Sequence, residues 1–245
     1  AENRRAFQIG RWAVVHPQQA ARLAEGPNVS ALPVDPVEYR ARRLVDYQDR
    51  ALAERFRALV ALAPPDLRDS VALGYYKLLA YKDEYEVARL YSEPEFRQQL
   101  EAQFEGDYKL QFHLAPAWLA KRDTVTGEPR KRELGPWVLN VFGVLAKFRY
   151  LRGTPLDPFG YGHDRRVERQ LIGEYEKTVD ELVAQLKPTN YRTAVAIAAL
   201  PEQIRGYGPV KERSIAKARQ QEKLLREQLA KGDEVQSVRL FQPAA

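Results

Sequence analysis

The sequence predicts a mainly α protein, a helical domain with one small β-hairpin or short antiparallel sheet. Apolar residues recur every three or four positions over long stretches, which is the spacing of one face of an α-helix. Pro and Gly interrupt these stretches where helices would end. Near residue 110 the apolar period changes to two, which is typical of a strand.

The composition excludes several classes of site. The chain of 245 residues has no Cys, which excludes disulfides, Cys-ligated zinc and thiolate-held iron–sulfur clusters. Its three His are too few for most His-based metal sites. The 39 Lys and Arg and the 33 Asp and Glu give a net charge of +6. We interpret this balance as an ordinary mixed-charge surface that binds no nucleic acid.

The expected organisation is an N-terminal helical arm at residues 1–30 and a helical domain at residues 31–245. A connection rich in Pro and Gly at residues 26–36 separates them. The longest apolar run, residues 194–200, is far shorter than the ~20 residues of a membrane span. The chain opens on Ala1 without an apolar signal core, which fits a processed fragment of a cytoplasmic protein.

Two long helices are expected in the first half of the domain, at residues 37–63 and 66–88. Asp66 is placed to cap the second helix, after a Pro pair that ends the first. Ser92 and Glu95 have the spacing of a capping box for a short third helix. The stripe of the second helix that should face the core consists of Leu67, Val71, Tyr75, Leu78, Tyr81, Tyr85 and Ala88.

A hairpin is predicted from alternating residues at 108–114, a turn at 123–129 and a partner strand at 130–134. Basic residues surround the turn: Lys121, Arg122, Arg130, Lys131 and Arg132. We interpret them as a solvated basic hairpin. The alternative is a contact surface for an anion or an acidic partner.

A very apolar helix follows at residues 137–151. Because it is apolar nearly all round, we expect it in the centre of the core. Further helices are expected at residues 164–186, 189–200 and 210–229, the first of them capped by Asp164.

Candidate polar sites are few. Motifs for nucleotide binding, for serine hydrolysis and for HExxH zinc sites are missing from the sequence. We interpret Asp83, Glu84 and Glu86 as part of a solvated helix face that also carries Lys82 and Arg89; the alternative is an acid–base site. The polar cluster that remains as a candidate site consists of Lys82, Glu86, Arg89, His113 and Arg152.

Several long segments of the chain resemble fused indolepyruvate ferredoxin oxidoreductases, members of the 2-oxoacid oxidoreductase superfamily. The resemblance covers most of the chain, and its segments are too specific to arise from composition alone. They are residues 79–91 (LAYKDEYEVARLY), 112–116 (FHLAP), 131–137 (KRELGPW), 151–154 (LRGT), 157–161 (DPFGY), 165–166 (RR), 168–169 (ER), 200–206 (LPEQIRG) and 210–212 (VKE), with 3–7 (NRRAF) and 10–11 (GR) at the start.

The chain departs from the family's pattern at a few positions. Leu79, Val138 and Val167 stand where the family's pattern has Met, which agrees with the absence of Met from the whole chain. Such swaps between apolar side chains of similar size are tolerated in a core. The segment at residues 162–164 also differs from the family's usual link.

The resemblance implies a part of a multidomain enzyme. That enzyme would oxidise an aryl pyruvate with loss of CO2, using thiamine diphosphate with Mg, iron–sulfur clusters and coenzyme A, and would reduce ferredoxin. The matched segment is its carboxy-terminal region. None of the family's catalytic, cofactor-binding or metal-binding residues can be placed on this chain, which also lacks a Gly-Asp-Gly signature for the thiamine diphosphate magnesium site.

Three hypotheses follow from the sequence. The first is an accessory domain that packs against the catalytic domains or subunits of such an oxidoreductase, or docks ferredoxin or another electron acceptor. The second is an independent enzyme with a pocket lined by Lys82, Glu86, His113 and Arg152. The third is a module that binds an acidic partner through the basic hairpin.

Overall fold

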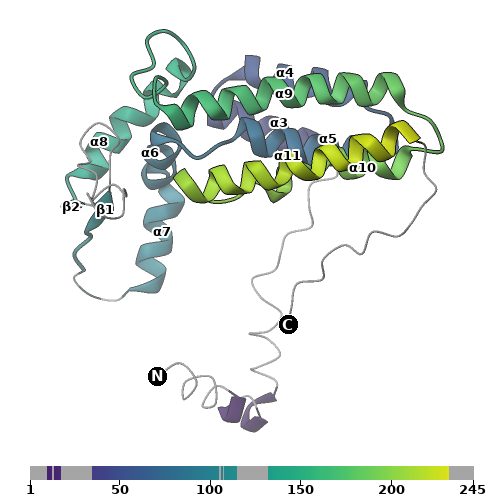
Figure 1. Ribbon diagram of the computed structural model, residues 1–245. Helices are drawn as coiled ribbons and strands as arrows, with labels where there is room; N and C mark the ends of the chain where they lie inside the picture. Colours follow the sequence, from purple (N-terminus) through teal and green to yellow (C-terminus); the bar gives the residue numbers. More distant parts are fainter. Residues whose placement is uncertain are drawn as a thin grey trace. The chain divides into compact units, whose positions relative to one another are not determined.

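The computed structural model describes residues 10–12, 14–17, 35–104, 106, 108–114 and 132–231. It confirms a mainly α fold with a two-stranded antiparallel sheet (Figure 1). By its contacts the chain divides into residues 1–39 and 40–245. The boundary falls within the first long helix, α3 (Pro36–Tyr47). In the first unit the structure describes helical residues at 10–12 and 14–15, and the division predicted near residue 30 stays a prediction.

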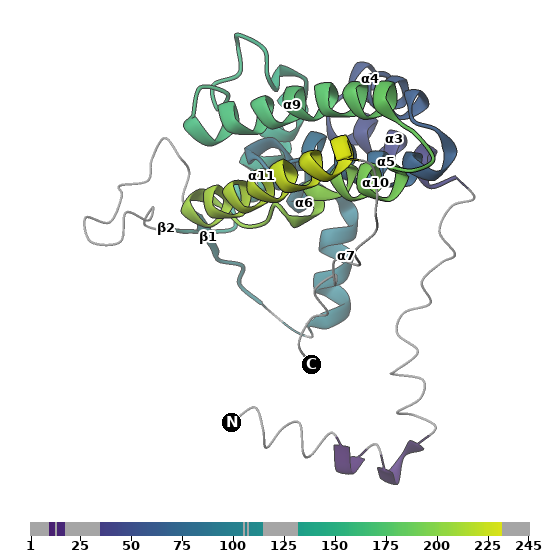
Figure 2. The ribbon, with the colours of Figure 1, turned by 45° about the vertical axis from the view of Figure 1, so that its right-hand side comes forward.

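A helical bundle forms the larger part of the second unit. Its elements are the C-terminal part of α3, α4 (Arg50–Leu62), α5 (Pro65–Leu79), α9 (His163–Gln185), α10 (Tyr191–Ala198), the 3-10 turn η2 (Leu200–Gln203) and α11 (Gly208–Lys231). Helix α5 packs against α4, α9, α10 and η2, and it is the central helix of the bundle. Helices α9 and α11 both run along the length of the bundle (Figures 1 and 2). Ion pairs between Arg219 and Glu174 and between Arg226 and Glu181 join them.

Three helices of the bundle approach one another closely at Gly74 in α5. An added Cβ at Gly74 would lie 2.7 Å from the backbone oxygen of Ala198 in α10 and 2.7 Å from the hydroxyl of Tyr175 in α9. The Tyr175 hydroxyl donates a hydrogen bond of 2.8 Å to that same backbone oxygen. Because no side chain fits between these groups, the contact of three helices requires Gly at this position.

A smaller lobe adjoins one end of the bundle (Figure 1). It contains α6 (Glu84–Ser92), α7 (Pro94–Gln103), β1 (Phe112–Leu114), β2 (Arg132–Leu134), α8 (Val138–Leu145) and the 3-10 turn η1 (Ala146–Leu151). Its own small core consists of Ala88, Phe112, Val138, Phe142 and Ala146. The ring of Tyr91 packs edge-on against Phe112 and stacks on Phe142, so α6 holds the hairpin and α8 together.

The predicted hairpin is confirmed, with shorter strands than the sequence suggests. Phe112 pairs with Leu134 and Leu114 with Arg132. The predicted turn at residues 123–129, with the basic residues Lys121, Arg122, Arg130 and Lys131, lies outside the residues that the structure describes.

Two helices that the sequence predicts as continuous are each divided by an Asp. The 37–63 segment breaks before Asp49, whose carboxylate accepts a hydrogen bond of 2.8 Å from the Leu52 backbone and caps α4. The 66–88 segment breaks between α5 and α6, and Asp83 caps α6 by accepting from the Glu86 backbone, also at 2.8 Å. An Asp side chain competes with the helix for backbone N–H groups, which explains both breaks.

Three predicted caps are wrong. Asp66 and Asp164 lie within the first turns of α5 and α9 and not at their N-caps, where they complement the helix dipole instead. Ser92 ends α6 and donates a hydrogen bond to the backbone oxygen of Ala88, so it does not begin α7. The predicted core position of the apolar helix is also wrong, because α8 lies in the small lobe (Figure 1) and one face of α8 and η1 is exposed.

Of the three positions at which the resemblance would place Met, two are buried. Leu79 is in the core of the bundle and Val138 in the core of the lobe, whereas Val167 is half-buried.

Among the described residues, the structure contains no helix with the length and apolar character that a membrane span needs.

Two Gly→Ala substitutions test the close approach of the helices. Gly74→Ala should lower the free energy of unfolding by about 1–3 kcal/mol, because the new Cβ forces α5 away from Ala198. Gly173→Ala in α9 is the matched control: its Cβ would meet nothing within 4 Å. That variant should be about 0.5–1 kcal/mol more stable, since Ala favours a helix interior. Urea unfolding measures both, and equal effects would contradict the packing described.

Candidate functional site

A buried ion pair joins the bundle to the lobe. The Arg152 guanidinium, at the end of η1, donates from Nε to Asp83 Oδ2 at 2.5 Å and from Nη2 to Asp83 Oδ1 at 2.8 Å. Both side chains are only 3% exposed. The third nitrogen, Nη1, donates to the backbone oxygen of Tyr47, the last residue of α3, at 2.8 Å. We call Tyr47, Asp83 and Arg152 the latch.

Aromatic rings enclose the latch. The carbon of the Arg152 guanidinium lies 3.6 Å from the centre of the Tyr47 ring and 5.5 Å from that of Tyr85. The Tyr47 hydroxyl donates to the backbone oxygen of Tyr81 at 2.8 Å. These rings exclude water and supply cation–π contacts to a cation that is already paired.

A loop after η1 is fixed to the same place by Asp157. Its carboxylate accepts hydrogen bonds from the backbones of Gly153 at 2.9 Å and Phe159 at 3.0 Å, and from the Tyr85 hydroxyl at 3.2 Å. Gly153 has φ of +74°, a left-handed conformation that Gly adopts without strain. The loop therefore closes over the latch as an ordered turn.

The electrostatics of the latch favour a permanent ion pair. Burial lowers the pKa of Arg152, but the hydrogen bond to Asp83 and the nearby negative charges raise it by more, so the net shift is upward. Burial and, next, the charge of Asp83 raise the pKa of the Tyr47 hydroxyl well above its usual range. Each guanidinium nitrogen of Arg152 already donates to an acceptor within the chain, and burial of the group separates it from solvent.

The expectation that Asp83 lies on a solvated helix face is wrong. Asp83 is 4% exposed and pairs with Arg152. Glu84 is partly buried and accepts from Arg165 in α9 at 3.0 Å, a second contact between the lobe and the bundle. Glu86 and Arg89 do form the predicted pair, at 2.7 Å, but their side chains are only 15% and 9% exposed, so the expectation of a solvated face is wrong for them too.

The candidate polar cluster does not form one site. Arg89 is 9% exposed and is held between Glu86 and Glu93 on α6. His113, on β1, has a side chain that is 55% exposed, with Nδ1 3.9 Å from Glu133 on the paired strand. Arg152 is enclosed in the latch. Lys82 is exposed and points to a different part of the surface.

Lys82 lines a hollow of about 110 Å³ near the N-terminal ends of α9 and α11. The other charged residues of its lining are His163, Asp164, Arg165, Glu168, Lys211 and Glu212. Most of these are paired: Lys211 with Glu168, and His163 Nε2 with Glu212 at 3.4 Å. Glu86, His113 and Arg152 do not line this hollow, so it is not the pocket that the sequence suggests.

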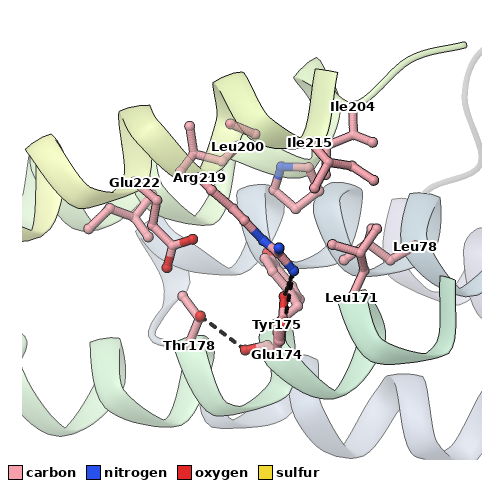
Figure 3. Close-up of a pocket in the computed structure, with 13 residues that line it drawn as sticks. Leu78, Leu171, Glu174, Tyr175, Thr178, Leu200, Ile204, Ile215, Arg219 and Glu222 are labelled. Atoms are coloured by element: carbon pink, nitrogen blue, oxygen red, sulfur yellow. Dashed lines mark hydrogen bonds and ion pairs between the residues drawn. The ribbon is translucent and has the colours of Figure 1, made fainter. Parts of the chain in front are cut away.

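A second hollow of about 60 Å³ lies between α5, α9, η2 and α11 (Figure 3). Its walls are mostly apolar, and Arg219 pairs with Glu174 at 2.9 Å beside it. Figure 3 shows the Arg219 side chain crossing the space between the two long helices. The volume suits a water molecule and is far below that of a metabolite site.

The most unusual surface is the outer face of α8 and η1. Trp137, Val141, Val144 and Phe148 recur at helical spacing, and between 42% and 58% of each is exposed. We call these residues the outer stripe. Periodicity alone could not find it, because an apolar helix looks the same whether it packs on its own core or on another protein. The charged residues in the 135–151 segment are Lys147 and Arg149.

This geometry defines a class of protein: a helical scaffold with a closed internal ion pair and an exposed apolar stripe. The chain belongs to DUF6537, a family of unknown function, which matches residues 34–224. That match runs from the start of α3 into α11 and so includes both the bundle and the lobe. No curated protein and no solved structure matches the chain.

Removal of the latch carboxylate should be strongly destabilising. Asp83→Ala leaves the Arg152 charge buried without its partner, which costs about 3–5 kcal/mol of unfolding free energy. Asp49→Ala is the matched control, because Asp49 also caps a helix but faces no buried cation; it should lose about 1 kcal/mol. Urea unfolding of the two variants measures the difference, and similar losses would show that Asp83 acts as a cap alone.

The tyrosines around the latch predict a loss of stability at alkaline pH. Burial, and then the charge of Asp83, raises the pKa of Tyr81 to about 12, against 10.0 when unfolded. The folded state thus holds the proton more tightly. The contribution of Tyr81 is complete below pH 10 and is lost as the pH rises from 10 to about 12.

Unfolding midpoints measured from pH 9 to 11.5 test this. Tyr81→Phe should have a higher midpoint relative to the unmodified chain as the pH rises through this range, because Phe has no proton to lose. Tyr207→Phe is the control, since Tyr207 is 67% exposed. An unchanged pH dependence in Tyr81→Phe would contradict the burial of this hydroxyl.

Proposed function

We propose that this chain is an accessory C-terminal domain of an indolepyruvate (aryl 2-oxoacid) ferredoxin oxidoreductase, with a structural or partner-docking role in oxidative decarboxylation. The observation that carries the proposal is where the segments of the resemblance meet. Residues 79–91 supply Asp83 and Tyr85, 151–154 supply Arg152, and 157–161 supply Asp157, all within the latch and its loop. The segments most like the family therefore specify how the domain holds its shape.

The contacts of these residues support a structural role over a catalytic one. Arg152 is buried and has an acceptor for each nitrogen, and Asp157 accepts three hydrogen bonds from within the chain. Thiamine diphosphate, Mg and the iron–sulfur clusters would belong to the other domains or subunits of the enzyme, as would the transfer of electrons to ferredoxin. A cytoplasmic location follows from the same proposal.

An independent enzyme or an anion-binding module is the alternative. Its support is the hollow beside Lys82, where the exposed ammonium lies near His163 and the first turn of α9. The pocket expected from the sequence cannot include Arg152 as a free cation, because the Arg152 guanidinium is paired with the Asp83 carboxylate. Binding of inorganic phosphate that is lost in Lys82→Ala would favour this alternative.

The proposal is tested by assaying indolepyruvate oxidation with thiamine diphosphate, Mg²⁺, coenzyme A and ferredoxin. The natural polypeptide that carries these residues, with its subunits, should turn over indolepyruvate. The purified 245-residue chain should show no turnover and no visible cluster absorbance. Turnover by the chain alone, or none by the assembled enzyme, would contradict the proposal.

A further inference from the structure

We infer that the outer stripe, residues Trp137, Val141, Val144 and Phe148, is the surface through which this domain binds a catalytic domain or subunit of the same oxidoreductase. The partner's matching surface is apolar at its centre and bears carboxylates at its edge. The inference rests on the proposed function and names the contact that it requires.

The apolar character of the stripe is the first argument. Trp137 and Val144 are each 58% exposed, although the segment that carries them is among the most apolar in the chain. Single exposed apolar residues are ordinary, but a contiguous row on one helical face marks an interaction site. Trp is also the residue most enriched where interface energy is concentrated.

The lobe itself has no element that covers the stripe within the described residues. The inner face of α8 packs on α6 through Val138 and Phe142, and the outer stripe stays exposed. The stripe thus lies on a rigid support, since the latch fixes the end of η1 to the bundle. A preformed rigid surface binds with a smaller loss of entropy than a mobile one.

The charges around the stripe select the partner. The exposed Lys147 adjoins Phe148 of the stripe, and the 135–151 segment has no acidic residue. Arg149 lies instead on the side of η1 that carries the buried Ala146, and its Nε is buried. An isologous contact with a second copy would bring two copies of Lys147 to one interface, in a chain whose net charge is already +6. A partner with carboxylates around an apolar patch complements this surface in both respects.

An anionic membrane would also attract an apolar stripe with cations. However, helices that bind membranes in this way carry many Lys and Arg along their polar face, whereas α8 and η1 offer Lys147 and Arg149 beside the enclosed Arg152. We therefore assign the stripe to a protein partner and treat membrane binding as an outcome of the test.

The test places a photo-crosslinking benzoylphenylalanine at Val144 in the assembled enzyme. After irradiation, cross-linked peptides mapped by mass spectrometry should come from a catalytic domain or subunit, in a segment where apolar residues adjoin Asp or Glu. The same probe at Leu62 in α4, which is 54% exposed and lies in the bundle, should give no such product. Cross-links solely to another copy of this chain, or none, would overturn the inference.

A second pair of variants tests the stripe without a probe. Val144→Glu should reduce the yield of assembled enzyme at least tenfold, whereas Leu62→Glu should not, and both isolated chains should keep the unfolding midpoint of the unmodified chain. Equal yields would overturn the inference. It would also be overturned if the isolated chain sedimented with vesicles of 70% phosphatidylcholine and 30% phosphatidylglycerol and Val144→Glu abolished this binding.

The inference and the proposed function fail in different ways. If the assembled enzyme oxidises indolepyruvate but Val144 gives no cross-link to a catalytic domain, the inference is wrong and the proposed function stands. If no indolepyruvate is oxidised, the proposed function is wrong. In that case the proposed partner is also wrong, regardless of which protein the probe at Val144 cross-links.

Discussion

The Asp83–Arg152 ion pair is the constraint on which the rest of the structure depends. It joins three segments, the end of α3, the turn between α5 and α6, and the end of η1, at one buried point. A buried ion pair adds little net stability compared with apolar residues of the same size, because both charges lose their hydration. Its value is specificity: a lobe that slips or rotates leaves two charges without partners, so a single arrangement of lobe and bundle is favoured.

The small core of the lobe explains why this joint is needed. Ala88, Phe112, Val138, Phe142 and Ala146 bury little apolar area, and the hairpin adds only short strands. Much of the apolar surface of α8 and η1 remains in water as the outer stripe, which stabilises nothing in the isolated chain. The latch therefore holds in place a lobe whose apolar surface we propose is completed by a partner.

The sequence predicts the helices and the hairpin well, because these follow from local periodicity. Helix α9 begins within a residue of its predicted start, and Phe112 and Leu134 lie in strands as expected. The sequence pattern does not show the break at Asp83, because Tyr81, Tyr85 and Ala88 around it continue the helical stripe. The partner of Asp83 lies 69 residues away, and no local pattern in one sequence shows such a pairing. Likewise, the apolar residues of α8 predict a buried helix, but they do not show which of its faces the chain itself covers.

The central claim is that the latch fixes the lobe to the bundle, and hydrogen exchange of Arg152→Met tests it most directly. Backbone amides of α6, α8 and η1 should exchange at least tenfold faster than in the unmodified chain, because Asp83 loses its partner and the lobe opens locally. Amides of α9, within the bundle, should keep their rates. Equal acceleration in lobe and bundle, or no change in the lobe, would contradict the account.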